Sequence, residues 1–122
     1  MANEISIFVD CSLRNGSVEN DFQPSTKSIN QTNARFSDRI LTIGTSEEDV
    51  TFSDLTQEGY VMIHNTDSTN YVTIGPKDGG SMVSFIKLNA GEFCVFRIVP
   101  TAVLRCAANT AACEVRFDCF DN

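Results

Sequence analysis

Strict alternation of apolar and polar residues is the feature that most constrains the fold of this chain. The last segment, CEVRFDCF at 113–120, shows it best. One face of that segment carries Cys113, Val115, Phe117 and Cys119, and the other carries Glu114, Arg116 and Asp118. A period of two is typical of a strand with one buried face. We therefore predict a strand here, and we treat Glu114, Arg116 and Asp118 as candidate interface residues, either facing solvent or meeting a partner.

The same pattern recurs through the second half of the chain. We expect strands in YVMIHN, YVTIG, MVSFIKL, EFCVFRIV, AVLRCAA and CEVRFDCF, between 60 and 120. The turn signals NTDSTN, GPKDGGS, NAGE and VPT separate them. Strand starts spaced by about 8–12 residues are typical of all-β sandwiches and barrels.

The first half is less regular. EISIFVDCSL at 4–13 alternates and predicts a strand, with a turn at Asn15-Gly16. Residues 17–34 are polar and contain Pro24, so we expect a long loop or an arm, with a strand around 27–33. DRILTIGTS predicts another strand. Residues 45–61 fit either a helix capped by Thr45 or Ser46, or a short strand at 50–53.

These segments predict an all-β protein. With 122 residues the chain has the length of one domain with its own core. We expect a single antiparallel β-sandwich over 1–122, jelly-roll-like, with about eight or nine strands. Its core residues should be Ile63, Val72, Ile74, Phe85, Ile86, Leu88, Phe93, Val95, Leu104, Val115 and Phe117.

Charge and cysteine content narrow the class of protein. A formal net charge of −7 argues against binding nucleic acid or anionic membranes, which attract Lys and Arg. The first residues, MANEISIFVDCSLRNG, lack the features of a targeting segment. The cysteines are odd in number and form no C-x-x-C pair, so we expect free thiols in a reducing cytosol, used as small core residues. They are Cys11, Cys94, Cys106, Cys113 and Cys119.

Chemistry-bearing residues are few and scattered. His64 is the only histidine, and we expect a strand histidine with local hydrogen bonds. Asn65, Asp67 and Asn70 resemble an incomplete calcium loop, but such side chains more often form turns. The glycine-rich segment around Lys77 lacks the spacing of a phosphate loop. Glu47, Glu48 and Asp49 have the pattern of a solvated charge run. We therefore expect no catalytic residues, no cofactor and no metal site.

Residues 59–122 resemble small structural proteins of tailed bacteriophage and prophage virions. The resemblance lies in three segments. They are N-x-D-x-x-N-Y-V-x-I-G (Asn65, Asp67, Asn70, Tyr71, Val72, Ile74, Gly75), F-x-x-L-x-x-G-E (Phe85, Leu88, Gly91, Glu92) and L-x-x-x-A-x-T-A-A (Leu104, Ala108 to Ala112). The N-terminal half matches only in SLRNGS and IGTSEED. The five cysteines are unusual for that family.

The resemblance implies a non-enzymatic part of a virion, made in the host cytoplasm. We favour a decoration or cement protein on the outer capsid shell, a homo-oligomer whose partners are the major capsid protein or tail proteins. The alternative is a head–tail connector or tail component. A carbohydrate-binding sandwich ranks below both, because the chain has no Trp and only Tyr60 and Tyr71. An enzyme ranks last.

Overall fold

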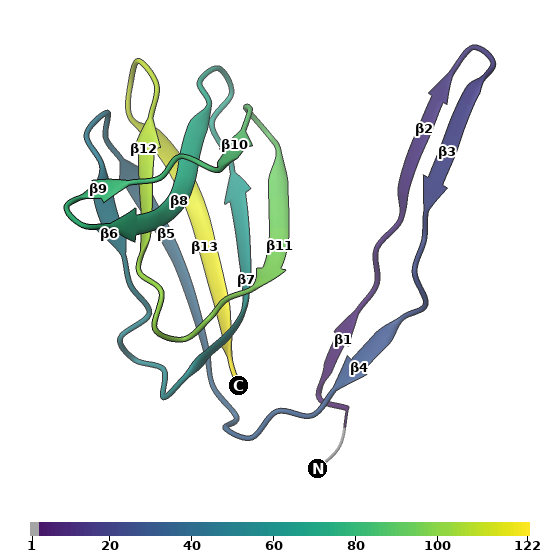
Figure 1. Cartoon of the computed structure of the whole chain (residues 1–122), viewed down its shortest axis with the longest axis horizontal. Coiled ribbons are helices and arrows are strands. Elements are labelled where there is room, and N and C mark those ends of the chain that lie inside the picture. The colour runs from purple at the N-terminus through teal and green to yellow at the C-terminus, as the bar shows by residue number, and fades with distance from the viewer. Residues whose placement is uncertain (1–2) are drawn as a thin grey trace. The chain divides into compact units, whose positions relative to one another are not determined.

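The computed structural model describes residues 3–122, and this part of the chain is all-β (Figure 1). It divides into two compact units: residues up to Thr32 form one, and residues from Asn33 onward form the other. The expected single domain over 1–122 therefore needs correction, because the sandwich begins only at Asn33. Within the described range no helix is long and apolar enough to cross a membrane.

The second unit is a two-sheet sandwich, as the alternation predicted. One sheet has the order β10-β8-β12-β6, with the short β9 beside β8, and the other has the order β11-β7-β13-β5. The strands are β5 (Phe36–Ile43), β6 (Glu48–Val50), β7 (Glu58–Asn65), β8 (Val72–Asp78), β9 (Ser81–Met82), β10 (Ile86–Leu88), β11 (Phe93–Arg97), β12 (Leu104–Ala108) and β13 (Cys113–Asp121). All pairs between them are antiparallel.

The order of the strands defines a jelly roll. From β5 to β8 and again from β10 to β13, each strand lies in the opposite sheet from the strand before it, and only β8 and β10 stay in one sheet. This gives the eight strands in two sheets that a jelly roll requires. The described residues form 13 strands where about eight or nine were expected, because the sandwich holds nine, β9 included, and the first unit adds four more.

The core lies between the two sheets and follows the alternation. Fully buried side chains come from both sheets, among them Ile63, Val72, Ile74, Val115 and Phe117. Leu88 and Leu104 are also buried, and Ile86 packs against this core from its edge. Three thiols, those of Cys106, Cys113 and Cys119, take core positions as predicted, whereas Cys94 is half-buried and Cys11 is exposed.

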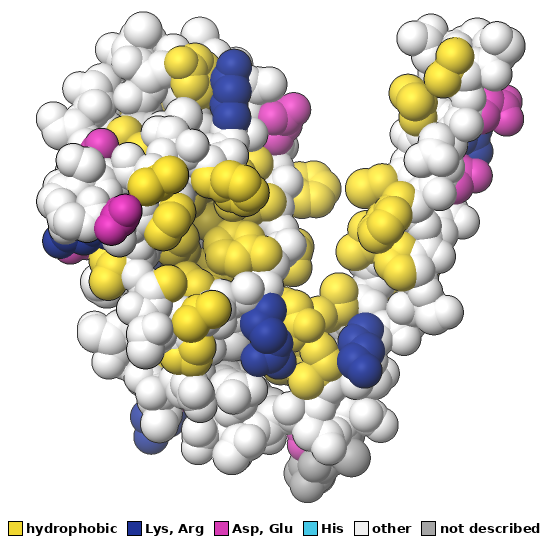
Figure 2. Space-filling view, in the orientation of Figure 1, with side chains coloured by type: hydrophobic (Ala, Val, Ile, Leu, Met, Phe, Trp, Pro, Cys, Tyr) yellow, Lys and Arg dark blue, Asp and Glu magenta, His cyan; other side chains and the backbone are white. Residues whose placement is uncertain are grey.

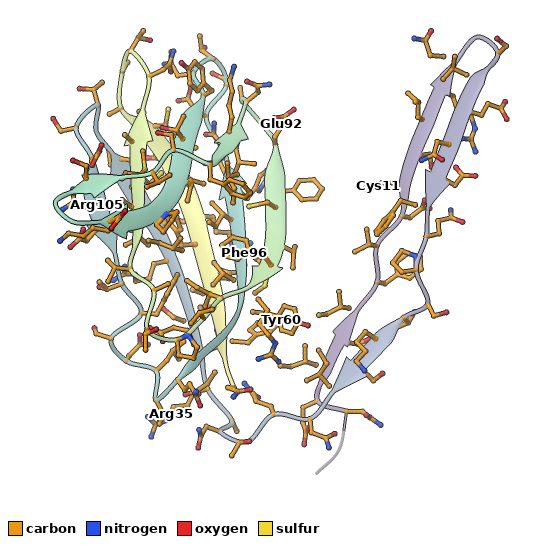
Figure 3. All side chains as sticks on the ribbon, viewed as in Figure 1. Cys11, Arg35, Tyr60, Glu92, Phe96 and Arg105 are labelled. Atoms are coloured by element: carbon orange, nitrogen blue, oxygen red, sulfur yellow. The ribbon has the colours of Figure 1, made fainter. Side chains whose placement is uncertain are left out.

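Three of the expected core residues are wrong. Phe85 is 83% exposed, Phe93 is 71% exposed, and Val95 is exposed as well. On β11 the inward and outward sides are the reverse of this expectation. Cys94 and Phe96 pack against the core (Phe96 is labelled in Figure 3). Phe93 and Val95 therefore lie on the exposed side of the strand. The segment EFCVFRIV is apolar on both faces, so its alternation did not fix which face is inside.

In the region 45–61 the strand alternative is the better one, but the strand lies at Glu48–Val50 and not at 50–53. β6 covers Glu48–Val50 and pairs with β12, and no part of 45–61 is helical. Val50 and Phe52 both join the core, and burial of these β-favouring side chains outweighs the capping signal at Thr45 and Ser46.

The first unit is a two-stranded arm. β1 (Ile5–Ile7) pairs with β4 (Lys27–Ile29), and β2 (Cys11–Asn15) pairs with β3 (Val18–Phe22). The predicted turn at Asn15-Gly16 closes the hairpin, with φ of +58° at Gly16, the first of the two loop residues. A glycine at that position suits a type II′ turn. The expected loop or arm at 17–34 thus holds two strands, and β4 lies inside the strand expected around 27–33.

The core assignment makes a direct prediction about stability. Replacing the fully buried Phe117 by Ala should cost about 3–5 kcal/mol of unfolding free energy, because it leaves a cavity between the sheets. The matched control is Phe85→Ala, which removes an exposed ring of the same size outside both the core and the outer face of the β11-β7-β13-β5 sheet, and it should change stability by at most about 0.5 kcal/mol. Urea unfolding of both variants measures this, and equal losses would contradict the assigned strand faces.

Gly75 allows the backbone at 83–85 to cross close over β8. A Cβ at Gly75 would lie 1.8 Å from the carbonyl oxygen of Val83, a backbone atom that cannot swing away. Gly75→Ala should therefore cost about 1–3 kcal/mol, as overpacking does. Gly80→Ala is the control, because a Cβ there meets nothing within 4 Å. Thermal unfolding that ranks the two variants equally would rule out this close approach.

Candidate functional site

The loop NTDSTN is held by the side chain of Asn65. Asn65 is fully buried at the end of β7, and its Nδ2 donates hydrogen bonds to three carbonyl oxygens. These belong to Asn70 at 2.9 Å, Leu88 at 3.1 Å and Asn89 at 3.3 Å. Its Oδ1 accepts from the N–H of Asp67 at 3.1 Å. One amide thus ties the end of β7 to the end of β10, which lies in the other sheet.

The carboxylate of Asp67 also bonds the backbone of this loop. One carboxylate oxygen of Asp67 accepts from the N–H of Thr69 at 2.9 Å and from that of Asn70 at 2.7 Å. The bond from Asn70, followed by that from Thr69, lowers the pKa of Asp67. Within residues 3–122 no group of three or more His, Cys, Asp or Glu side chains is placed to hold a metal ion. The loop is a structural joint.

A second polar cluster lies on the sheet that contains β6 and β12. Arg105 on β12 bonds Asp49 at 2.7 Å, Glu47 at 3.0 Å and the carbonyl of Gly80 at 3.1 Å (Figure 3). Hydrogen bonding to Arg105 lowers the pKa of Asp49. Lys77 adds a contact of 3.7 Å to Asp49. The acidic run at 47–49 is therefore more than a solvated face: it joins an edge strand to β12 and to the β8–β9 turn.

The outer face of the sheet β11-β7-β13-β5 is the strongest candidate site. We call this surface the outer sheet face. It carries four large exposed apolar side chains, those of Phe36, Ile40, Phe93 and Val95. Met62 and Phe120 lie on the same face and are half-buried. An apolar surface that extends over four strands is characteristic of a protein contact.

The candidate interface residues lie on this face. Glu114, Arg116 and Asp118 project from β13 at exposed or half-buried positions. The structure adds Asp38 of β5, which lies directly opposite Asp118 in the strand register. Arg116 bridges the two carboxylates, at 2.9 Å from Asp118 and 3.4 Å from Asp38.

The carboxylates of Asp38 and Asp118 are two like charges held close together on neighbouring strands. Carboxylates directly opposite each other on neighbouring strands repel, and Arg116 only partly offsets the repulsion. Burial, followed by the hydrogen bond with Asp38, raises the pKa of Asp118 in spite of Arg116. Local arrangements that work against stability concentrate at functional positions.

His64 borders a shallow depression on the same face. Its ring meets that of Phe93 edge-on, with centroids 6.0 Å apart. The depression has a volume of about 280 Å³, and its lining includes Met62, Val95, Arg116 and Asp118. A hollow with apolar walls and a charged edge suits a side chain of a partner protein.

Burial makes two of the thiols unreactive, and each tyrosine ring lies against a cation. Burial raises the pKa of Cys106 to about 12 and that of Cys119 to about 11, so both stay protonated and unreactive at neutral pH. The ring of Tyr60 lies 4.7 Å from the guanidinium of Arg97, and that of Tyr71 lies 4.3 Å from the ammonium of Lys87. Each tyrosine thus has one ring face covered by a cation.

Sequence reasoning identified one strand of this surface and missed the others. Glu114, Arg116 and Asp118 followed from the alternation of β13. Asp38 and Ile40 were available from the alternation of β5, where Ile40 faces away from Leu41 and the core. Phe93 and Val95 were assigned to the core, because apolar side chains on both faces of β11 hide its orientation.

A comparison of the chain with models of known protein families finds no match, and neither does a comparison with curated protein sequences. The proposals below therefore rest on the residues of the chain and on the resemblance described above.

The role of Asn65 is testable by substitution. Asn65→Ala should cost about 1–3 kcal/mol, because it leaves buried carbonyl groups without donors. Asn65→Asp should cost more, because it places a buried carboxylate against those same carbonyl oxygens. Urea unfolding gives both values, and an Asp variant as stable as the native chain would show that the Nδ2 bonds do not hold this joint.

At the other end of the sandwich the buried Asp121 holds residues 56 and 57. Its carboxylate accepts from the N–H of Thr56 at 2.8 Å and from that of Gln57 at 3.2 Å. Burial alone would raise the pKa of Asp121, but these bonds and others outweigh it, and the net shift is downward. A carboxyl group with a lowered pKa stabilises the fold when it is ionised.

The sign of this effect predicts the pH dependence. The contribution of Asp121 is fully present above its unfolded pKa of about 4 and is lost as the pH falls through its lower folded pKa. The Asp121→Asn variant should be less stable than the native chain near neutral pH. Its stability should also fall less steeply than that of the native chain below about pH 4. Thermal melting points from pH 2 to pH 7 measure this, and parallel curves for the two proteins would contradict it.

Proposed function

We propose that this chain is a non-enzymatic structural protein of a tailed-phage virion, acting as a decoration or cement protein on the outer capsid shell. One observation carries the proposal: large apolar side chains are exposed both on the arm and on the outer sheet face. Exposed apolar area of this extent is buried when subunits assemble.

The architecture supports the same role. A jelly roll is a rigid unit found among viral capsid and lectin domains. The arm adds a second contact element to that unit, so one molecule can bridge two neighbours. The resemblance of residues 59–122 to virion proteins makes the major capsid protein the favoured partner, in a homo-oligomer located on the virion.

A head–tail connector or tail component is the second candidate. The arm favours it as much as it favours a cement protein, because connecting proteins also span between neighbouring rings of subunits. The two candidates differ in where the protein lies on the particle, and imaging separates them.

The test is antibody labelling of purified particles from the source of the chain. Label distributed over the shell is the expected result for a decoration or cement protein. Label at one vertex or along the tail would replace that assignment with the second candidate. Particles without label, with the protein free in the lysate, would overturn the virion proposal.

A matched pair of variants sharpens this test. Val95→Asp places a charge on the outer sheet face, and Glu19→Lys changes a charge on an exposed polar position of β3. We expect the first variant to lose incorporation into particles and the second to keep it. Native incorporation of both would show that the outer sheet face is not a particle contact.

A further inference from the structure

Two exposed apolar surfaces of this protein differ in where their charges lie. On the β2–β3 hairpin, apolar side chains follow one side and charged ones follow the other (Figure 2). The apolar side of the hairpin therefore carries no charge that would select one partner over another. On the outer sheet face, by contrast, charged side chains stand among apolar ones. These charges can select a partner by its own charge.

The strand register arranges the side chains of the outer sheet face in rows. One row crosses all four strands and consists of Val95, Met62, Asp118 and Asp38. This row is apolar on β11 and β7 and acidic on β13 and β5. Arg116 stands in the neighbouring row, on the same strand as Asp118. A side chain with an apolar stem and a positively charged end matches this order of groups.

The depression of about 280 Å³ lies where this row changes from apolar to acidic. Its lining includes the apolar side chains of Met62, Phe93 and Val95 and the carboxylate of Asp118. Neighbouring strands lie about 4.8 Å apart, and the four-carbon stem of a lysine is long enough to cross that spacing. A lysine that enters beside Val95 can therefore pack its stem on Met62 and bring its ammonium group to Asp118.

The charges around Asp118 do not balance. Asp38 lies directly opposite, and Arg116 bridges the two carboxylates at 2.9 Å from Asp118 and 3.4 Å from Asp38. When both carboxylates are ionised, one negative charge remains in excess. Burial, followed by the bond with Asp38, raises the pKa of Asp118 in spite of Arg116, so the negative charge of Asp118 is incompletely stabilised. A second cation in the depression would stabilise it.

The same charges disfavour two other occupants. An anionic side chain would have to displace a carboxylate from Arg116, which is bonded to both Asp38 and Asp118. A second copy of this chain would bring its own net charge of −7 to a depression that already has negative charge in excess. The depression is therefore complementary to a positively charged side chain on a different protein.

We propose that this depression binds a lysine side chain on the surface of a partner protein. The proposal rests on the proposed function in treating the outer sheet face as a protein contact, and it names the chemistry of the partner. The ammonium group of the lysine pairs with Asp118 and balances two carboxylates with two cations. Apolar neighbours of the lysine pack on the exposed side chains of Phe93, Val95 and Ile40.

The probe is a pentapeptide, blocked at both ends, with a central lysine between two leucines. Two control peptides replace the lysine with Nε-acetyllysine, which lacks the charge, and with glutamate, which reverses it. Each peptide is added to the ¹⁵N-labelled full-length protein. At millimolar concentration the lysine peptide should cause saturable shifts of the amides of Met62, Val95 and Asp118, and both controls should bind about tenfold more weakly. No saturable shift, or equal binding of either control, would overturn the proposal.

Three variants, each with its melting point measured to confirm folding, locate the site. Asp118→Asn should weaken binding of the lysine peptide about tenfold. Asp78→Asn is the matched control, because it removes an equal charge from an exposed position of β8, and it should leave binding unchanged. Arg116→Gln removes the competing cation and should tighten binding of the lysine peptide. Weaker binding to Arg116→Gln, or equal losses in the two aspartate variants, would contradict the proposed site.

Dilution of the protein without peptide tests for a second copy in the depression. Shifts of the same amides on dilution would assign the depression to self-association and overturn the proposal. All of these measurements use the purified protein without particles. A protein that labels capsid shells but binds no lysine peptide would therefore reject the lysine contact and leave the proposed function intact.

Discussion

The core of the sandwich is complete without the arm, and the exposure of apolar side chains on the arm follows from this constraint. Every buried residue of the core cluster comes from Ile43 onward. The two strand pairs before Thr32 therefore receive no share of that core. Within this unit Ile5 is buried, but Phe8, Leu13, Val18 and Phe22 remain exposed, and hydrophobic burial on the order of 25 cal/mol per Å² favours covering them. This imbalance supports the proposed assembly more directly than any single contact does.

Buried polar groups hold the two ends of the sandwich. Asn65 uses its amide to join loops from both sheets, and Asp121 uses its carboxylate to fix residues 56 and 57. In each case the side chain replaces backbone bonds that irregular segments cannot make among themselves. Neither joint uses an exposed side chain of the outer sheet face. The residues that first suggested a site, Asn65 and Asp67, thus have a structural role: they hydrogen-bond the backbone at one end of the sandwich.

Much of the fold was readable from the sequence, because alternation and burial agree on most strands. β13, β7 and β8 each present one apolar face, and their inner residues are the buried ones. β11 could not be read this way, since Phe93 and Val95 are as apolar as Phe96 on the opposite face. The separate arm was also hidden, because alternation in EISIFVDCSL reports an amphipathic strand but not the surface that covers it. Alternation alone could place Asp38 on the outward side of β5, but its position opposite Asp118 follows only from the pairing with β13, a contact between positions 80 residues apart.

The central proposal is that the exposed apolar side chains of the arm are covered when the chain assembles with neighbouring subunits. Hydrogen exchange of the full-length protein at a series of concentrations tests it most directly. The account predicts that amides of β2 and β3 gain protection as concentration rises, while those of β7 and β13 stay equally protected throughout. Arm amides that exchange at the same rate at every concentration would contradict it.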